Sequence, residues 1–82
     1  MGAGAFRFQP IAVNANAPGG ACVLQTFDDV GAFILTNVDL PRRLAPHWIA
    51  VRQDLLQARY SVRRAEVHQA LRDALRAEGW LA

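Results

Sequence analysis

The segment from Ser61 to Gly79 constrains the fold most, because it carries a stripe of apolar residues on one side of a helix. They recur at steps of three and four, the spacing of an amphipathic α-helix, and comprise Val67, Ala70, Leu71, Ala74 and Leu75. Ser61 is predicted to cap this helix, and Gly79 to end it in a left-handed conformation. Such a stripe must be buried against another part of the chain, and we expect it to face the N-terminal segment.

The N-terminal segment has the pattern of two strands. Phe6–Val13 alternates with period two but changes phase at Pro10, which is typical of an edge strand or a bulged one. Residues 14–20, NANAPGG, are turn-forming, and Ala21–Gln25 is predicted to be the second strand, with Cys22 half-buried. Together these residues predict an antiparallel β-hairpin with a loop of about seven residues.

Two further helices are expected between the hairpin and the last helix. Thr26 is a predicted cap followed by two carboxylates, and the helix it begins should stop at Asn37 in a left-handed conformation. Residues 38–46 form a proline-containing connector, and Pro46 can be the first residue of the next helix. The helix that begins at Pro46 has a predicted buried stripe, which comprises Leu44, Trp48, Val51, Leu55 and Ala58. Ile49 and Leu56 are expected to widen this stripe.

The sequence therefore predicts one small globular α+β domain over residues 1–82. An N-terminal antiparallel β-hairpin packs against three α-helices (ββααα), of which the second and third are an antiparallel pair. A composition of 52% hydrophobic and 20% charged residues is that of a chain with a core. Because there is one cysteine and neither a signal-peptide pattern nor a long apolar run, we expect a cytoplasmic protein that does not enter the membrane.

Several segments resemble a small bacterial family, domain of unknown function 982. The likeness is carried by "TFDDVGAFIL" from Thr26, the connector proline Pro41, Ala50 and Ala58 in the second helix, and "RRAEVHQALRDALRAEGWL" at the end. The resemblance covers about 55 residues and implies the fold and a bacterial origin. The family has no assigned activity, so the resemblance implies no catalytic residue.

Basic residues form a row on the last helix, where four-residue steps place Arg64, His68, Arg72 and Arg76 on one side. Arg59 and Arg63 lie just before it. The row has two interpretations: a surface that contacts nucleic acid or another anion, or the solvated side of a helix whose other side is buried. Arg63 and Arg64 with the free amides of the helix start are also a candidate anion pocket. The net charge of +2 is too small to decide between them.

Residues for catalysis or metal binding do not form a recognisable set. Cys22 with His47 or His68 could make a thiolate pair, but the sequence marks no orienting group and no oxyanion site. The histidines lack metal-ligand spacing, and no cofactor-binding loop is present. We therefore expect no enzyme, no metal and no cofactor.

Trp80 follows the terminal glycine and has two interpretations, a lid on the last helix or an exposed anchor for a partner. The edges of a two-stranded hairpin are also open to pairing with another copy. The leading functional hypothesis is thus a non-catalytic protein-interaction module, which binds a protein partner or itself as a homodimer. The alternative is a weak nucleic-acid or anion binder that uses the arginine row.

Overall fold

The structure is a computed structural model, and it describes residues 7–57 and 64–82. A hairpin is followed by helices, which confirms the predicted α+β arrangement of a two-stranded antiparallel sheet and helices. The elements in chain order are β1 (Arg7–Val13), β2 (Cys22–Thr26), α1 (Phe27–Asn37), α2 (Leu40–Arg43), α3 (Pro46–Gln57) and α4 (Arg64–Glu78).

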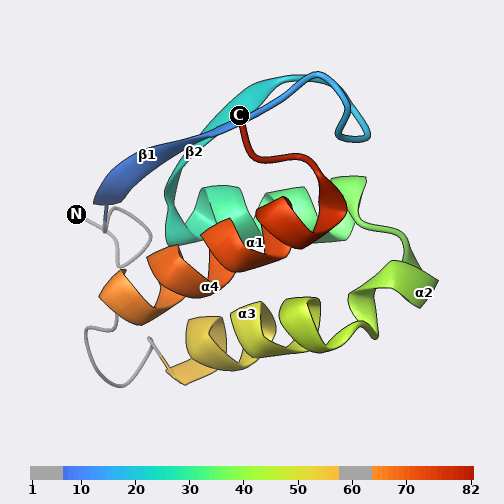
Figure 1. Ribbon diagram of the computed structural model, residues 1–82. Coiled ribbons are helices and arrows are strands. Elements are labelled where there is room, and N and C mark those ends of the chain that lie inside the picture. The colour runs from blue at the N-terminus through green and yellow to red at the C-terminus, as the bar shows by residue number, and fades with distance from the viewer. Residues whose placement is uncertain (1–6, 58–63) are drawn as a thin grey trace.

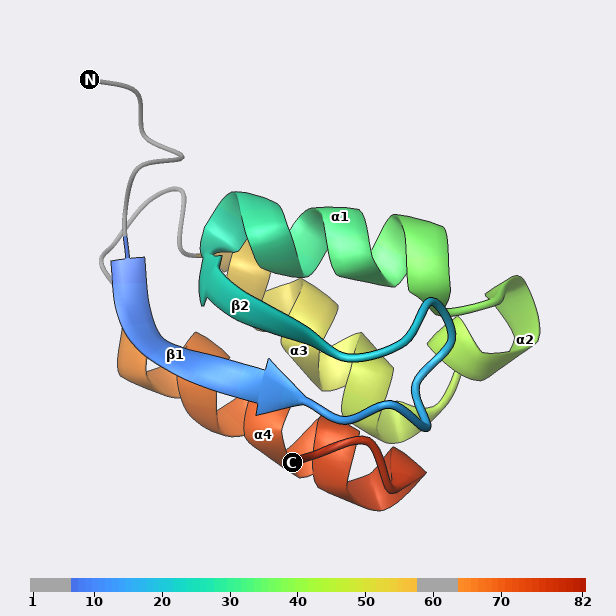
Figure 2. The same cartoon turned by 90° about the horizontal axis from the view of Figure 1, so that it is seen from above.

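The helices all lie on one side of the hairpin (Figure 1). Seen from above in Figure 2, β1 lies over α4 and β2 lies over α1, and these are also the pairs of elements in contact. α3 forms the layer farthest from the hairpin and packs against α4, to which it runs antiparallel as predicted. The core therefore has the hairpin above it and helices below.

The hairpin has the predicted irregularity. Ile11 pairs with Leu24 and Val13 with Cys22, and the register shifts between Arg7 and Ile11, around Pro10. Ile11, Val13 and Leu24 are buried against the helices. Cys22 is exposed, so the prediction that it is half-buried is wrong: it is the first residue of β2, beside the turn, and α1 borders it on one side without covering it fully.

α1 begins as predicted and ends differently. The hydroxyl of Thr26 accepts a 3.0 Å hydrogen bond from the amide of Asp29, whose carboxylate accepts one from the amide of Thr26 at 3.1 Å, which is a capping box. Asn37 is not left-handed, because every described residue with positive φ is a glycine. Instead the chain leaves α1 through Val38, which is extended and places its side chain in the core at 1% exposure.

The connector contains a short additional helix, α2, which the sequence did not predict. Leu44 lies between α2 and the start of α3 at Pro46, outside the periodicity of either helix, and it is 71% exposed rather than buried. Trp48 and Val51 are fully buried as predicted. Ile49 and Leu56 are 39% and 58% exposed, so the wider stripe was wrong, because α3 is an outer layer covered on one side.

α4 places its stripe as predicted. Val67, Leu71, Ala74 and Leu75 have no exposed surface, and α4 contacts β1 on one side and α3 on the other. The predicted cap, Ser61, and the last residue of the α3 stripe, Ala58, lie outside the described residues.

The residues after α4 return to the hairpin, which the sequence did not predict. Gly79 has φ +78°, as expected for a left-handed helix end, and turns the chain so that Leu81 pairs antiparallel with Val13. Two backbone hydrogen bonds flank this pair: the amide of Asn14 donates to the Trp80 carbonyl at 2.8 Å, and the amide of Ala82 to the Ala12 carbonyl at 3.1 Å. One end of β1 thus has a partner on both edges.

Candidate functional site

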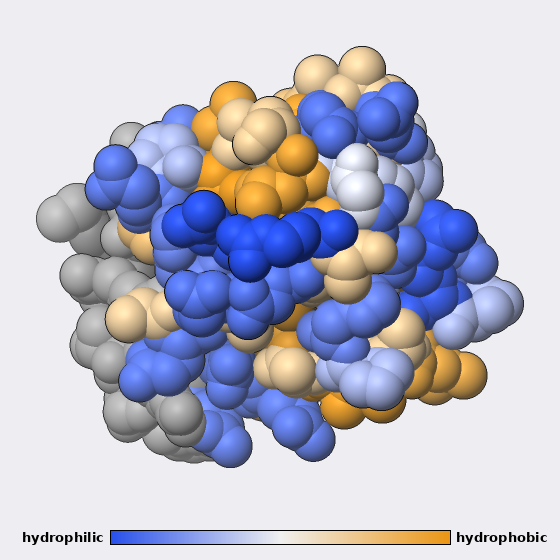
Figure 3. Space-filling view, in the orientation of Figure 1, coloured by the Kyte–Doolittle hydropathy of each residue, from blue (hydrophilic) through white to orange (hydrophobic). Residues whose placement is uncertain are grey.

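A groove about 200 Å³ in volume lies between β1 and α4. It begins beside the C-terminal residues that pair with β1 and follows the outer edge of the strand toward Gln9. Its lining, which includes no acidic side chain, is Gln9, Pro10, Ile11, Ala12, His68, Arg72, Leu81 and Ala82. In Figure 3 hydrophobic residues gather between β1 and α4, and a hydrophilic band borders them along α4. The groove thus combines an apolar wall with a basic one.

His68 belongs to the predicted basic row, but it is partly buried rather than solvated. Its ring meets the ring of Phe8 edge-on at a centroid distance of 5.6 Å. Its Nε2 atom is buried and has no hydrogen-bond partner among the described residues. A buried polar atom without a partner costs about 1–3 kcal/mol relative to a paired one, so stability alone does not explain a histidine here.

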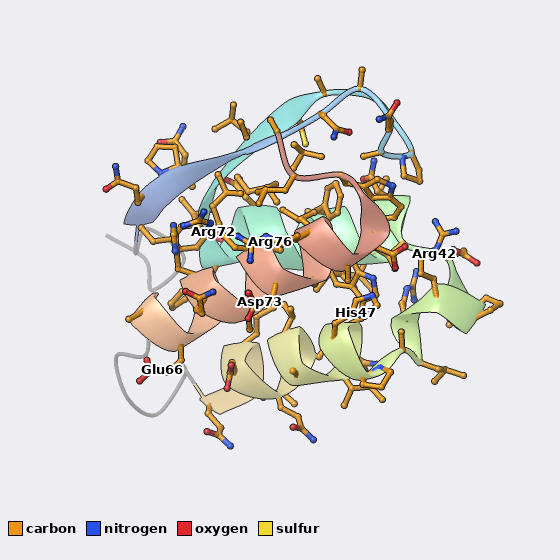
Figure 4. All side chains as sticks on the ribbon, in the orientation of Figure 1. Arg42, His47, Glu66, Arg72, Asp73 and Arg76 are labelled. Carbon is orange, nitrogen blue, oxygen red and sulfur yellow. The ribbon has the colours of Figure 1, made fainter. Side chains whose placement is uncertain are left out.

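Arg72 supplies the charge of the groove and forms no ion pair with any residue that the structure describes. Arg76, the next member of the row, is 62% exposed and lies 3.8 Å from Asp73, a surface contact that contributes little. Figure 4 shows both arginines on the side of α4 that faces β1, whereas Glu66 and Asp73 lie on the side that faces α3. Arg72 and Arg76 therefore lie on the β1 side of α4, and Asp73 lies close enough to neutralise part of the charge of Arg76.

The other members of the predicted row cannot be added to this surface. Arg59 and Arg63 lie outside the described residues, so the proposed anion pocket at the start of the helix lies outside them as well. Arg64 is the first residue of α4, and the position of its side chain is not described. The structure thus brings together His68, Arg72 and Arg76 on the β1 side of α4.

Trp80 is a core residue, and the prediction of an exposed anchor is wrong for it. It is 5% exposed and lies 6.1 Å from Trp48 and 6.3 Å from Phe33, measured between ring centroids. Its amide donates a 2.8 Å hydrogen bond to the Leu75 carbonyl, because Gly79 folds the chain back onto the last turn of α4. This arrangement confirms the alternative, a lid on the helix.

A cluster centred on Glu78 was missed at the sequence level. One carboxylate oxygen, Oε2, accepts from the indole Nε1 of Trp48 at 2.9 Å and lies 3.0 Å from His47 Nε2. The other oxygen lies 3.5 Å from Arg42 Nε, and the Arg42 guanidinium covers the Trp80 ring at 5.1 Å. The signal that could have found it is Trp48 itself, since a buried indole N–H needs an acceptor.

The pKa of Glu78 reflects this environment. Burial works to raise its pKa, but the hydrogen bonds from His47 and Trp48 and the charge of Arg42 outweigh burial, so the pKa lies below its ordinary value. The carboxylate is therefore ionised near neutral pH. Its partners come from α2 and α3, whereas Glu78 is the last residue of α4, so the cluster holds the C-terminal turn in place and is not an open site.

The edges of the hairpin are less open to pairing than the sequence predicts. On β1, Leu81 covers one end and Pro10, which has no N–H, interrupts the remainder. The carbonyl of Ala12 points away from β2, toward Ala82. In an antiparallel pair of this kind, the backbone N–H and C=O of the residue opposite, Val23, point away from β1, to the free edge of β2. The next outward amide on β2 is that of Gln25, which donates to Asp29 at 2.9 Å. Few backbone N–H and C=O groups on the strand edges therefore remain for pairing with a second copy of the chain.

The remaining candidates for chemistry are weak. Burial and the nearby Asp29 carboxylate raise the pKa of the Cys22 thiol, which is the opposite of what activates a cysteine nucleophile. In the described part of the chain no group of three metal-ligating side chains occurs. No described helix is long and apolar enough to span a membrane.

Comparison with known proteins gives no match: no family model, curated protein or solved structure is found to be similar to the chain.

Proposed function

We propose that this protein is a non-catalytic interaction module that binds an extended segment of a partner protein in the groove between β1 and α4. The observation that carries the proposal is the lining of that groove. It joins an apolar strand edge to a histidine with an unpartnered buried nitrogen and an arginine without an ion pair in the described structure. A bound chain would cover the apolar strand edge and could pair with the arginine, so it would gain contacts that the free protein lacks.

An extended segment suits the groove because this chain already uses the same edge for itself. Leu81 and Ala82 lie along β1 as a short strand, and the groove continues from the point where their pairing with β1 stops. Pro10 removes one backbone donor, so a bound segment would depend on side-chain contacts as well as on strand pairing. Specificity would then come from the side chains of α4.

Selection of peptides tests this function without assuming their sequence. Random twelve-residue peptides displayed on phage are selected on the wild type and measured on Ala12→Trp, which places a large side chain at an exposed strand residue on the border of the groove. Ala50→Trp, on the exposed side of α3, is the matched control. We expect at least about tenfold weaker binding to Ala12→Trp and no change with Ala50→Trp. Equal binding to all three proteins would refute the groove as the interaction surface.

A homodimer is a second candidate, favoured by two exposed leucines, one at each end of α2. Leu40 and Leu44 are 70% and 71% exposed, lie four residues apart, and cover no part of this chain's core. Light scattering of the wild type at high concentration should give a dimer, and the double variant Leu40→Gln, Leu44→Gln should give a monomer. A monomeric wild type would exclude this candidate.

Anion or nucleic-acid binding is the alternative that uses the arginine row, and it is favoured by the missing ion pair of Arg72 within the described residues. Binding to polyanions weakens steeply as salt rises, whereas apolar contacts in the groove do not weaken. A steep salt dependence with a loss of binding in Arg72→Gln would favour it. We also propose that the protein is cytoplasmic and that it is related to domain of unknown function 982. Neither proposal implies a biochemical activity.

A further inference from the structure

The α4 side of the groove is basic, and the lining contains no aspartate or glutamate side chain to pair with that charge. Arg72 lies in the groove, and Arg76 extends the same side of the helix beyond it (Figure 4). Glu66 and Asp73 lie on the other side, toward α3, and the exposed contact of Asp73 with Arg76, at 3.8 Å, is weak enough for a partner's carboxylate to replace it. Charge complementarity therefore favours a partner whose carboxylates face α4.

The spacing of the two arginines adds a second constraint. Residues four apart on a helix are separated by about 6 Å along its axis, because each residue rises about 1.5 Å. Alternate residues of an extended chain, which point the same way, are separated by about 6.6 Å. β1 and α4 run side by side in the same general direction in Figures 1 and 2, so a segment lying along β1 also lies along α4.

We propose that the partner segment is an extended peptide with acidic side chains at two alternate positions, which pair with Arg72 and Arg76, and with apolar residues between them. The apolar residues lie against the wall formed by Ile11 and Leu81. This inference rests on the proposed function of the groove and names the chemistry of its partner.

Fluorescence polarisation with three labelled five-residue peptides tests the inference. The first has glutamate at positions two and four and valine elsewhere. The second has the same composition with the two glutamates adjacent, and the third has lysine in place of glutamate. We expect the first to bind about tenfold more tightly than the second, and the third not to bind. Equal affinity for the first two, or binding of the lysine peptide, would overturn the inference.

Variants show whether the arginines are responsible. Arg72→Gln and Arg76→Gln should each weaken binding of the alternating peptide by about tenfold. Arg52→Gln, which removes an exposed arginine from α3, should leave the affinity unchanged. If neither α4 variant changes the affinity, the inference is wrong. If a ten-nucleotide thymidine strand displaces the peptide at equal concentration through the same arginines, the partner is a nucleic acid and the inference is wrong.

The outcomes also separate this inference from the proposed function. Phage-selected peptides that are blocked by Ala12→Trp but lack acidic residues would support the groove and contradict its acidic partner. Selected peptides that bind Ala12→Trp as well as the wild type would contradict the proposed function itself.

Discussion

The indole Nε1 of Trp48 donates a 2.9 Å hydrogen bond to Oε2 of Glu78, which joins the first turn of α3 to the last turn of α4. Glu78 immediately precedes the glycine that returns the chain to β1. The same carboxylate lies beside His47 and Arg42, and Arg42 covers the buried Trp80. This contact therefore fixes the segment that forms one end of the groove.

Glu78→Gln should lower the free energy of unfolding by about 1–3 kcal/mol, because it replaces charge-assisted hydrogen bonds by neutral ones in a site where Glu78 is 15% exposed. Urea denaturation at neutral pH measures the loss. Asp73→Asn, which removes a carboxylate that is 55% exposed on the same helix, is the control and should change little. A loss in Asp73→Asn as large as that in Glu78→Gln would contradict the role of the cluster.

Acid should weaken the same cluster. The folded-state pKa of Glu78 is below its ordinary value of 4.5, so its contribution to stability is complete above that value and is lost as pH falls toward the lowered pKa. Arg42, Asp39 and the imidazole of His47 are the other ionisable groups at the site. We expect the difference in stability between the wild type and Glu78→Gln to shrink below about pH 4. A difference that stays constant from pH 7 to pH 3 would refute the pKa shift.

Asn14→Asp should release the C-terminal segment from β1. The side-chain amide of Asn14 donates to the carbonyls of Gly79 at 2.9 Å and Leu81 at 3.4 Å, and aspartate has no donor for either. We expect a loss of roughly 1–2 kcal/mol and faster hydrogen exchange at the Ala82 amide. Asn16→Asp is the matched control, since its side chain makes no hydrogen bond with a described residue. Equal exchange in both variants would contradict this account.

Two glycines give opposite predictions for the same substitution. A Cβ at Gly31 or at Gly79 would meet nothing within 4 Å, but only Gly79 has a positive φ, of +78°. Gly31→Ala should raise the thermal midpoint, because it stabilises the helix by about 0.5–1 kcal/mol. Gly79→Ala should lower it by a similar energy. Changes of the same sign in the two variants would show that the left-handed turn is not needed.

His68→Leu should keep or increase stability, by up to about 1 kcal/mol, because it removes the buried nitrogen that has no partner in the described structure. His47→Leu is the comparison, since it removes a histidine that contacts Glu78 at 3.0 Å, and it should destabilise. Thermal unfolding measures both. If the two substitutions destabilise equally, Nε2 of His68 has a partner, and the groove loses one of its supporting observations.

Local rules in the sequence predicted the elements that depend on neighbouring residues. The cap at Thr26, the start of α3 at Pro46, the left-handed Gly79 and the buried stripe of α4 all follow from residue types and spacing within a few residues. Leu56 was misplaced because exposure depends on which side of α3 another element covers, and Leu44 because it lies before α3 begins at Pro46. Asn37 was misplaced because burial of Val38 decides how α1 ends.

The candidate site was predicted only in part for the same reason. The spacing of His68, Arg72 and Arg76 placed them on one side of a helix, but only the fold shows that this side faces the edge of β1. The return of Leu81 to Val13 and the contact between Trp48 and Glu78 join residues far apart in the chain. No periodicity within a segment carries that information.

Backbone amide chemical shifts test the groove most directly. A ¹⁵N-labelled sample is titrated with the peptide that has glutamate at positions two and four and valine elsewhere. The account predicts the largest shifts at Ile11, Ala12, His68, Arg72 and Leu81, and little change along the exposed side of α3. Shifts that concentrate on α2 or α3 and leave β1 and α4 unchanged would contradict it.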